Sequence, residues 1–198
     1  RLLDASAGTV SVDGWDVRQI PLQTLRKNIG FVTQEVFIFS DTIRNNVLFG
    51  RTGISQDHLT TVLRAAGIIE DIENLEKGLD TFLGERGITL SGGQRQRLTI
   101  ARALIQAPPI LILDDALSMV DTRTEEKILN QILNLRQNKT TLIVSHRIST
   151  IRRTERIAVL DRGKLAELGT HKKLLEKGGI YTALYEKQVI AEELERGV

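Results

Sequence analysis

The sequence predicts an α/β fold in which helices flank a largely parallel sheet. First, short apolar runs that are typical of strands alternate along the chain with segments of helical periodicity. Second, Ile110–Leu113 (ILIL) is an unbroken apolar run of the kind that parallel sheets bury on both faces. Third, 198 residues with 41% hydrophobic and 26% charged side chains suit one domain, or most of a somewhat larger one.

The first third of the chain contains two expected strands and one expected helix. Gly8–Val12 is the first strand, and a turn at Asp13–Gly14 follows it. Ile29–Thr33 is the second strand. Ser55–Ala66 has apolar residues at helical spacing, and Ser55 is suited to cap this helix.

The rest of the chain continues the alternation. A helix is expected from Ser91 to Gln106, and Pro108–Pro109 prevents it from continuing. Further elements are expected in this order: the strand Ile110–Leu113, the helix Thr122–Gln137, the buried strand Thr141–Ser145, a hairpin of Arg156–Leu160 and Lys164–Leu168, and an amphipathic helix from Ile180 to about Glu195.

Composition and charge exclude some classes of function. The net charge is +2, with 27 basic and 25 acidic residues, so bulk charge does not suggest nucleic-acid binding, although the pI near 9.0 does not exclude it. Without cysteine there is no disulfide framework and no thiolate metal site, which fits a reducing cytosolic location. No apolar run approaches the roughly 18 residues that cross a bilayer.

Three expected strands end in polar residues that suit phosphate chemistry. Asp114–Asp115 follow ILIL, His146 follows Thr141–Ser145, and Gln34 follows Ile29–Thr33. In open parallel sheets, ligands bind beyond the carboxyl ends of the strands, so these side chains point to one shared site.

Each of these residues has a functional and an ordinary interpretation. Asp114 could hold Mg²⁺ beside substrate phosphates, or it could cap the following turn. Asp115 could polarise an attacking water. His146 could donate a hydrogen bond to a terminal phosphate, yet a lone histidine is more often structural. A glutamine after a strand, such as Gln34, is common.

Ser91–Gln94 is a more specific signal. A serine followed by Gly92 and Gly93 begins a helix, so free backbone N–H groups and the positive end of the helix dipole face an incoming anion. The glycines lack Cβ atoms and let an anion approach the backbone. The alternative is an ordinary capped helix, which the nearby ILILDD segment disfavours.

These motifs together resemble the nucleotide-binding domain of ATP-binding cassette (ABC) transporters. The resemblance extends over essentially the whole chain and assigns each motif as follows: Leu90–Gln94 as the signature motif, Ile110–Asp114 as Walker B, Ser118–Asp121 as the D-loop, Gln34 as the Q-loop and His146 as the switch histidine. Asp41–Gly50, Leu83–Gly87 (an X-loop) and Gly169–Tyr185 resemble segments of ABC exporters.

The resemblance implies a P-loop NTPase-like ABC ATPase fold that occupies residues 1–198 without its first strands. About 35–106 would form a helical subdomain that carries the Q-loop, X-loop and signature; 107–170 would carry Walker B, the D-loop, the switch histidine and the hairpin; 171–198 would form C-terminal helices. The implied cofactors are ATP and Mg²⁺. The implied roles are catalysis by Asp115, His146 and Gln34, nucleotide contact by Ser91, Gly92, Gly93, Gln94 and Asp121, and metal binding by Asp114 and Gln34.

The implied function is ATP hydrolysis that drives transport by an exporter. In the family, two such domains sandwich two ATP molecules, so the expected partners are a second nucleotide-binding domain and transmembrane domains, at the cytoplasmic face of the membrane and without nucleic acid. Two alternatives are a soluble ABC ATPase acting on nucleic acid or ribosomes, and a non-catalytic dimerisation module.

Two departures from the family pattern qualify this interpretation. The sequence contains no G-x-x-x-x-G-K-[ST] phosphate loop, so we expect a truncated chain that alone binds ATP poorly and hardly hydrolyses it. Asp115 stands where exporters usually carry glutamate. In heterodimeric exporters one half often lacks this glutamate but keeps an intact LSGGQ, which predicts a non-identical partner.

Overall fold

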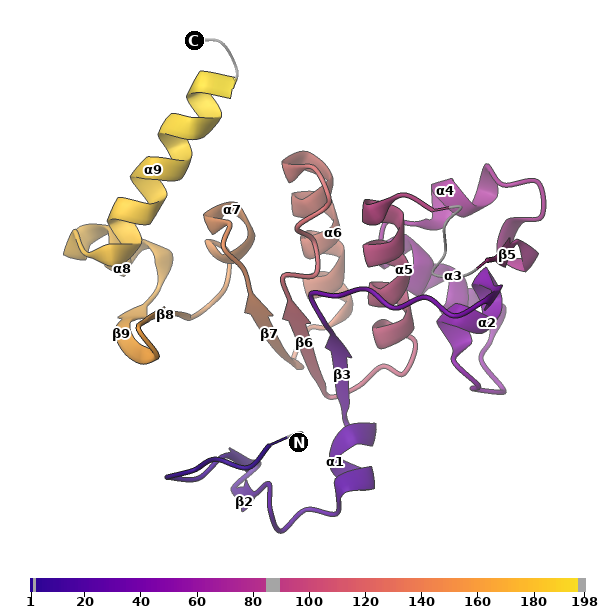
Figure 1. Cartoon of the computed structure of the whole chain (residues 1–198), viewed down its shortest axis with the longest axis horizontal. Coiled ribbons are helices and arrows are strands. Elements are labelled where there is room, and N and C mark those ends of the chain that lie inside the picture. Colours follow the sequence, from indigo (N-terminus) through magenta and orange to yellow (C-terminus); the bar gives the residue numbers. More distant parts are fainter. Residues whose placement is uncertain (2, 85–89, 196–198) are drawn as a thin grey trace. The chain divides into compact units, whose positions relative to one another are not determined.

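The computed structural model describes residues 1, 3–84 and 90–195 (Figure 1). The chain divides into two compact units, Arg1–Ile143 and Val144–Val198. Among the described residues, no helix combines the length and the apolar character that a membrane span requires.

A three-stranded sheet forms the centre of the first unit, in the order β3 (Ile29–Val32), β6 (Ile110–Asp114) and β7 (Thr140–Val144), whose last residue belongs to the second unit. β3 and β6 are parallel, and Val32 pairs with Leu113. The parallel sheet predicted from ILIL is therefore confirmed.

Burial of the strands differs from the prediction. In β6, Leu111 and Leu113 are buried, but Ile110 and Ile112 are only partly buried, so one face of the strand is incompletely covered. The prediction that Thr141–Ser145 forms a buried strand is wrong: Leu142 of β7 is 54% exposed. β7 lies at the edge of the sheet, where an apolar run has fewer neighbours to cover it.

The N-terminal segment is a small hairpin of β1 (Ser11–Val12) and β2 (Trp15–Asp16). The strand is shorter than the predicted Gly8–Val12, but the predicted turn is confirmed, with Asp13 and Gly14 at φ values of 50° and 83°. The short helix α1 (Leu22–Lys27) then leads into β3.

Helices carry most of the core of the first unit. In chain order they are α2 (Ile43–Leu48), α3 (Gln56–Ala65), α4 (Ile69–Glu73), the 3₁₀ helix η1 (Gly78–Asp80), α5 (Gly92–Leu104) and α6 (Thr122–Leu135). A two-stranded pair, β4 (Asp41–Thr42) and β5 (Phe82–Leu83), lies among them. Leu98, Ile100 and Leu104 of α5 are buried in this core, and α5 contacts α2, α3 and β3.

Side-chain caps fix where these helices begin. The predicted cap Ser55 accepts a hydrogen bond from the His58 N–H, and Ser91 caps α5 in the same way. Such caps are each worth about 1 kcal/mol. Ile128 and Ile132 of α6 are fully buried, whereas Leu135 near the end of the same helix is 38% exposed.

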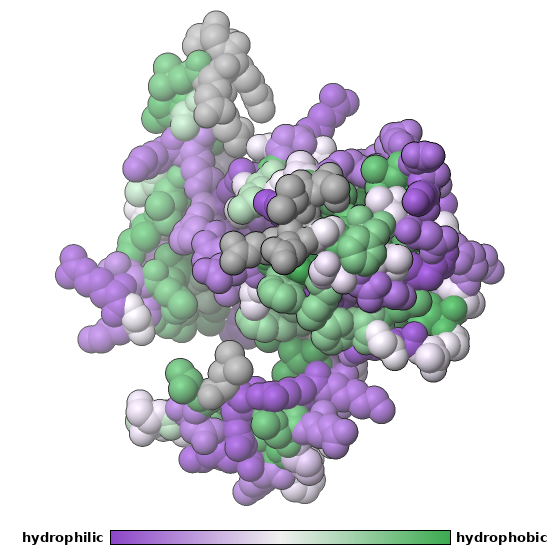
Figure 2. Space-filling model, turned by 45° about the vertical axis from the view of Figure 1, so that its right-hand side comes forward, coloured by the Kyte–Doolittle hydropathy of each residue, from purple (hydrophilic) through white to green (hydrophobic). Residues whose placement is uncertain are grey.

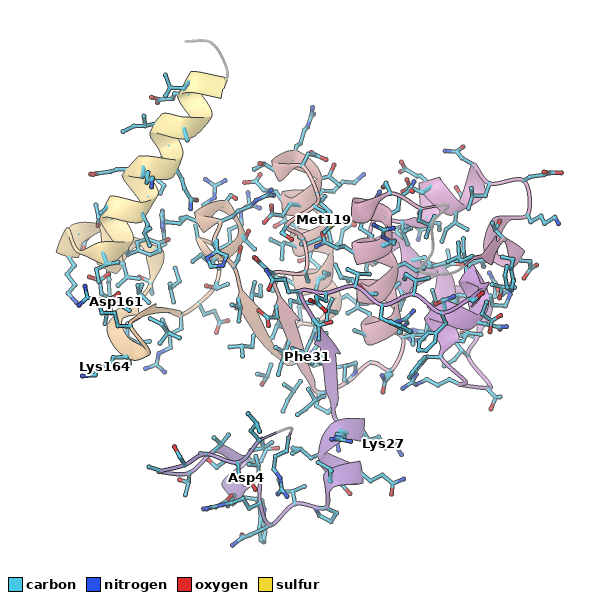
Figure 3. The ribbon with its side chains drawn as sticks, viewed as in Figure 1. Asp4, Lys27, Phe31, Met119, Asp161 and Lys164 are labelled. Atoms are coloured by element: carbon cyan, nitrogen blue, oxygen red, sulfur yellow. The ribbon has the colours of Figure 1, made fainter. Side chains whose placement is uncertain are left out.

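The second unit consists of α7 (Ile148–Ile151), the antiparallel strands β8 (Ile157–Asp161) and β9 (Lys164–Gly169), α8 (His171–Lys177) and α9 (Ile180–Glu195). The predicted hairpin is confirmed, and its turn lies between Asp161 and Lys164 (Figure 3). Ile148, Ile157, Leu174 and Tyr181 form the core of this unit.

Glu167 fixes the start of α9. Its carboxylate accepts hydrogen bonds from the N–H groups of Ile180 (3.2 Å) and Tyr181 (3.0 Å). A Cβ atom at Gly179 would collide with this carboxylate, so any other residue there would displace the Glu167 side chain.

Candidate functional site

The start of α5 is held by a reciprocal pair of hydrogen bonds. The Gln94 N–H donates to Ser91 Oγ (3.2 Å), and the Ser91 N–H donates to Gln94 Oε1 (2.8 Å). This capping box satisfies two backbone donors and orients the first turn. The exposed Ser91 hydroxyl accepts from the helix, so its proton can still be donated to an anion.

The other end of the Gln94 amide is bound to α4. Gln94 Nε2 donates to Asp71 Oδ1 (2.8 Å), and Arg97 Nη1 lies 2.7 Å from Asp71 Oδ2. Asp71 was not among the residues predicted from the sequence, because nothing in its local pattern distinguishes it from other helical acids. Both ends of the Gln94 amide are thus engaged within the chain.

Gly92 and Gly93 pack directly against the segment between β6 and α6. A Cβ atom at Gly92 would lie 2.7 Å from Met119 Sδ, and one at Gly93 would lie 3.0 Å from the Met119 carbonyl oxygen. Close backbone packing therefore favours glycine at position 93, whereas at position 92 a Cβ atom would meet only the flexible end of the Met119 side chain.

Gln96 ties the same two segments together. Its side chain is fully buried; Nε2 donates to Ser118 Oγ (3.0 Å), and Oε1 accepts from the Met119 N–H (2.9 Å). The sequence analysis missed Gln96. Its spacing could have identified it, because Gln96 lies on the same helix face as the buried Ile100 and Ala103. A polar side chain on a buried face needs hydrogen-bond partners.

A cavity of about 450 Å³ lies between the start of α5 and the start of α6. Met119, which lies between these helices in Figure 3, is part of its wall. The full lining is Ser91, Gly92, Gly93, Arg97, Met119, Val120, Asp121 and Thr124. A helix N-terminus and a hydroxyl suit an anion, although the Arg97 guanidinium is engaged by Asp71 and the Asp121 carboxylate also belongs to the lining.

Asp121 has an observed role in the fold. Its carboxylate caps α6 by accepting the Thr124 N–H (2.9 Å). Hydrogen bonds from Thr124, first from its backbone, hold the pKa of Asp121 below its ordinary value. The carboxylate is therefore ionised at neutral pH at the edge of the cavity.

Two predicted residues lie at the carboxyl ends of the neighbouring strands β6 and β3. Asp114 is the last residue of β6, and Gln34 lies two residues beyond Val32, which pairs with Leu113. A carboxylate and an amide oxygen at this edge are the hard donors that Mg²⁺ prefers. Asp115 adopts a left-handed conformation (φ 49°), which aspartate tolerates better than most residues.

His146 belongs to the second unit and lies two residues after β7. The backbone around it is held by Gln188 of α9: Gln188 Nε2 donates to the His146 carbonyl oxygen (2.6 Å), and Gln188 Oε1 accepts from the Ile148 N–H (2.8 Å). Sequence reasoning missed Gln188, because its partners lie far away along the chain.

An exposed aromatic surface lies at the other end of α5. Phe37, Phe39 and Phe49, whose rings contact one another in sequence, are 62%, 38% and 51% exposed. Figure 2 shows hydrophobic side chains gathered on the first unit. Part of this surface lines a hollow of about 600 Å³ that includes Phe39, Asp41 and Phe49. Of the predicted X-loop, residues 85–87 lie outside the described part of the chain.

Arg102 supports this surface from within α5. Its guanidinium lies 5.1 Å from the Phe39 ring centre and 5.6 Å from that of Phe49, and it donates to the carbonyl oxygens of Phe37 and Asn46 at 2.8 Å each. Burial lowers the pKa of Arg102 to about 10, so it stays protonated at neutral pH. One helix therefore joins the aromatic surface to Ser91.

Comparison with known proteins gives a consistent result. A family model described as "ABC transporter" matches residues 1–118. Over 188 residues the chain is 44% identical to an ATP-dependent lipid A-core flippase of Desulfotalea psychrophila and 46% identical to that of Chromobacterium violaceum, covering 95% of this chain and 33% and 32% of those proteins. It is also 43% identical to ATP-binding cassette sub-family B member 6 of Xenopus tropicalis, covering 95% of this chain and 22% of that protein.

A solved structure agrees with these relatives. The structure of a bacterial Atm1-family ABC exporter with ATP bound superposes with a TM-score of 0.89 at 41% sequence identity. The match covers 94% of this chain and 33% of that one. The α/β fold predicted from the sequence is thereby confirmed.

Proposed function

Because this chain belongs to the ABC transporter family, we propose that it is the ATP-binding and ATP-hydrolysing domain of an exporter. The chain spans about a third of the length of the flippases that it matches. The relatives at this identity are exporters and flippases, which favours this function over a soluble ABC ATPase that acts on nucleic acid or ribosomes.

The observation that carries the proposal is the cavity at the start of α5. Ser91, Gly92 and Gly93 offer a hydroxyl and a helix N-terminus to an anion, and the wall formed by Met119 fixes their backbone. We propose that the anion is the γ-phosphate of an ATP held by a second nucleotide-binding domain, because Leu90–Gln94 resembles the signature motif that faces the partner's ATP in this family.

We propose that a second ATP binds at the carboxyl ends of β3 and β6. Asp114 and Gln34 would hold Mg²⁺, which neutralises charge on the phosphates when it is bound. Asp115 would polarise the attacking water, and His146 would donate a hydrogen bond to the terminal phosphate. The proposal for this second site concerns the assembled transporter, in which a phosphate loop would hold the ATP beside Asp114 and Gln34.

We further propose that the partner domain is not identical to this one. Asp115 is one methylene shorter than the usual glutamate, and a misplacement near 1 Å costs about a hundredfold in rate. The site that contains Asp115 would bind ATP and turn it over slowly, whereas Ser91–Gly93 would complete the fast site on the partner.

The aromatic surface supports attachment to transmembrane domains at the cytoplasmic face of the membrane. Phe39 and Phe49 are exposed apolar side chains that stack on one another, and clustered exposed apolar side chains mark interaction surfaces. Arg102 links this surface to the helix that begins at Ser91, so movement of a docked membrane segment would reach the phosphate cavity through α5.

Two substitutions in the assembled transporter test these proposals. Ser91→Arg fills the cavity and should abolish most ATP hydrolysis, whereas Thr61→Arg, on an exposed face of α3, should leave it unchanged. If Ser91→Arg retains the full rate of phosphate release, the proposed phosphate contact is wrong.

Asp115→Glu tests the slow site. It should raise ATP hydrolysis in the transporter, up to about a hundredfold at that site, because the longer carboxylate reaches the water. An unchanged rate would contradict the unequal pair of sites.

A further inference from the structure

We propose that Asp71 is a positioning residue that orients the phosphate-binding end of α5 through the Gln94 amide. The inference rests on the proposed function, in which Ser91–Gly93 contacts ATP. Asp71 lies in α4, 23 residues before Gln94, and its side chain is 25% exposed.

The chemistry of the carboxylate determines which way the Gln94 amide points. A primary amide has one end that donates and one that accepts, but an ionised carboxylate only accepts. Asp71 Oδ1 therefore selects the NH₂ end of Gln94 at 2.8 Å, which turns Oε1 toward the Ser91 N–H, also at 2.8 Å. If the Gln94 amide were turned over, its NH₂ group would face the Ser91 N–H, and two donors would meet without an acceptor.

Arg97 fixes Asp71 in the orientation that this selection needs. Arg97 Nη1 lies 2.7 Å from Asp71 Oδ2 and also donates to the Gly67 carbonyl oxygen. Gly67 packs closely against α6: it has φ +67°, and a Cβ atom there would lie 2.8 Å from Ile128 Cγ1. The carboxylate thus has a rigid support on one side and the Gln94 amide on the other.

The consequence is concentrated at Ser91. The capping box makes Ser91 Oγ an acceptor for the Gln94 N–H, which leaves its proton directed away from the helix. If the amide turned over, the Ser91 N–H would lose its acceptor, and Ser91 would keep only the hydrogen bond from the Gln94 backbone N–H to its hydroxyl. The Asp71 and Arg97 side chains are 25% and 15% exposed, so removing one partner also affects folding, and stability has to be measured beside the reaction.

The test compares two variants of the assembled transporter that make the same charge change on the same helix. Asp71→Asn removes the carboxylate that selects the amide, and Glu73→Gln removes an exposed carboxylate of α4 as the control. We expect Asp71→Asn to lower kcat for ATP by about tenfold. The dissociation constant for ATP should stay the same, since ATP is first held by the partner's phosphate loop. Glu73→Gln should match the wild type in both quantities.

A rescue separates positioning from a merely structural role. In the double variant Asp71→Asn with Gln94→Glu, the new amide can donate to the new carboxylate, whose other oxygen accepts the Ser91 N–H. Recovery of kcat would support the inference, and a further fall would overturn it. Thermal unfolding midpoints within a few degrees of wild type would confirm that each variant is folded.

The outcomes also distinguish this inference from the proposed function. If Ser91→Arg abolishes hydrolysis while Asp71→Asn retains the wild-type kcat, the inference fails and the proposed function stands. If Ser91→Arg retains full hydrolysis, the proposed function fails, and the role of Asp71 fails with it.

Discussion

The backbone at Ser91 in the first unit and the backbone around His146 in the second are both held by a glutamine amide, but from different distances along the chain. Gln94 reaches the Ser91 N–H three residues before it. Gln188 reaches the His146 carbonyl oxygen across 42 residues. In each case the amide satisfies one acceptor and one donor, which only a primary amide of this length can do.

The difference shows which kind of support a sequence reveals. The capping box at Ser91 is local, so it follows a recognisable pattern of a serine with glutamine three residues later. The support from Gln188 depends on where α9 lies in the second unit, and Tyr181 together with the Glu167 cap determines that position. The first is encoded in a motif and the second in packing.

The largest expected loss of stability tests whether the backbone near Ser91 is held by glycine packing as well as by the Gln94 amide. Gly93→Ala places a methyl group 3.0 Å from the Met119 carbonyl oxygen, a backbone atom that cannot move freely, and should lower the free energy of unfolding by about 2–3 kcal/mol. Gly92→Ala meets only the flexible end of the Met119 side chain and should cost less. Denaturant unfolding of the transporter variants measures both, and equal losses would contradict the packing explanation.

The next effect tests the distant amide. Gln188→Met keeps the length of the side chain but removes both hydrogen bonds, at about 1–2 kcal/mol of unfolding free energy in total. Hydrogen exchange should accelerate at the Ile148 N–H and stay unchanged at the Ser91 N–H, because the two amides act in separate units. Lys187→Met, at an exposed position of α9, is the control. Unaltered exchange at Ile148 would refute the support from Gln188.

The smallest expected loss of stability concerns the carboxylate cap of α6 at Asp121, which is compared with the two glutamine amides. Asp121→Ala removes the cap of α6 and should cost about 1 kcal/mol at neutral pH. Because the pKa of Asp121 is lowered from the ordinary 3.8, its contribution is complete above that value and is lost as pH falls through the lowered pKa. Asp121→Asn should keep much of the cap without this pH dependence. The free energy of unfolding, measured as the pH is lowered, would show this difference. Identical acid profiles for wild type and Asp121→Asn would rule out a contribution from the ionised carboxylate.

Much of the fold was predictable because its signals are local. The strands at Ile29–Val32 and Ile110–Asp114, the hairpin and the helix Ile180–Glu195 follow directly from periodicity and turn residues. The exposure of Leu142 was not predictable, since an apolar strand reads the same at the centre and at the edge of a sheet.

The candidate site was predictable in its motifs and not in its supports. Ser91 was identified because a cap followed by glycines is a sequence pattern, and the structure places it at the cavity. Asp71 and Gln188 were missed, because each acts through a contact that forms only after the chain has folded. Their residue types also occur throughout ordinary solvent-exposed helix faces, so composition gives no indication of them.

Met119 gives the phosphate cavity a chemical sensitivity of its own. It is the one methionine of the sequence and is 61% exposed, and its Sδ lies where a Cβ atom at Gly92 would be 2.7 Å away. Oxidation to the sulfoxide adds a polar oxygen to that sulfur, and reductases can remove it again. An oxidant that reached this surface would therefore crowd the start of α5, and enzymatic reduction of the sulfoxide would reverse the change.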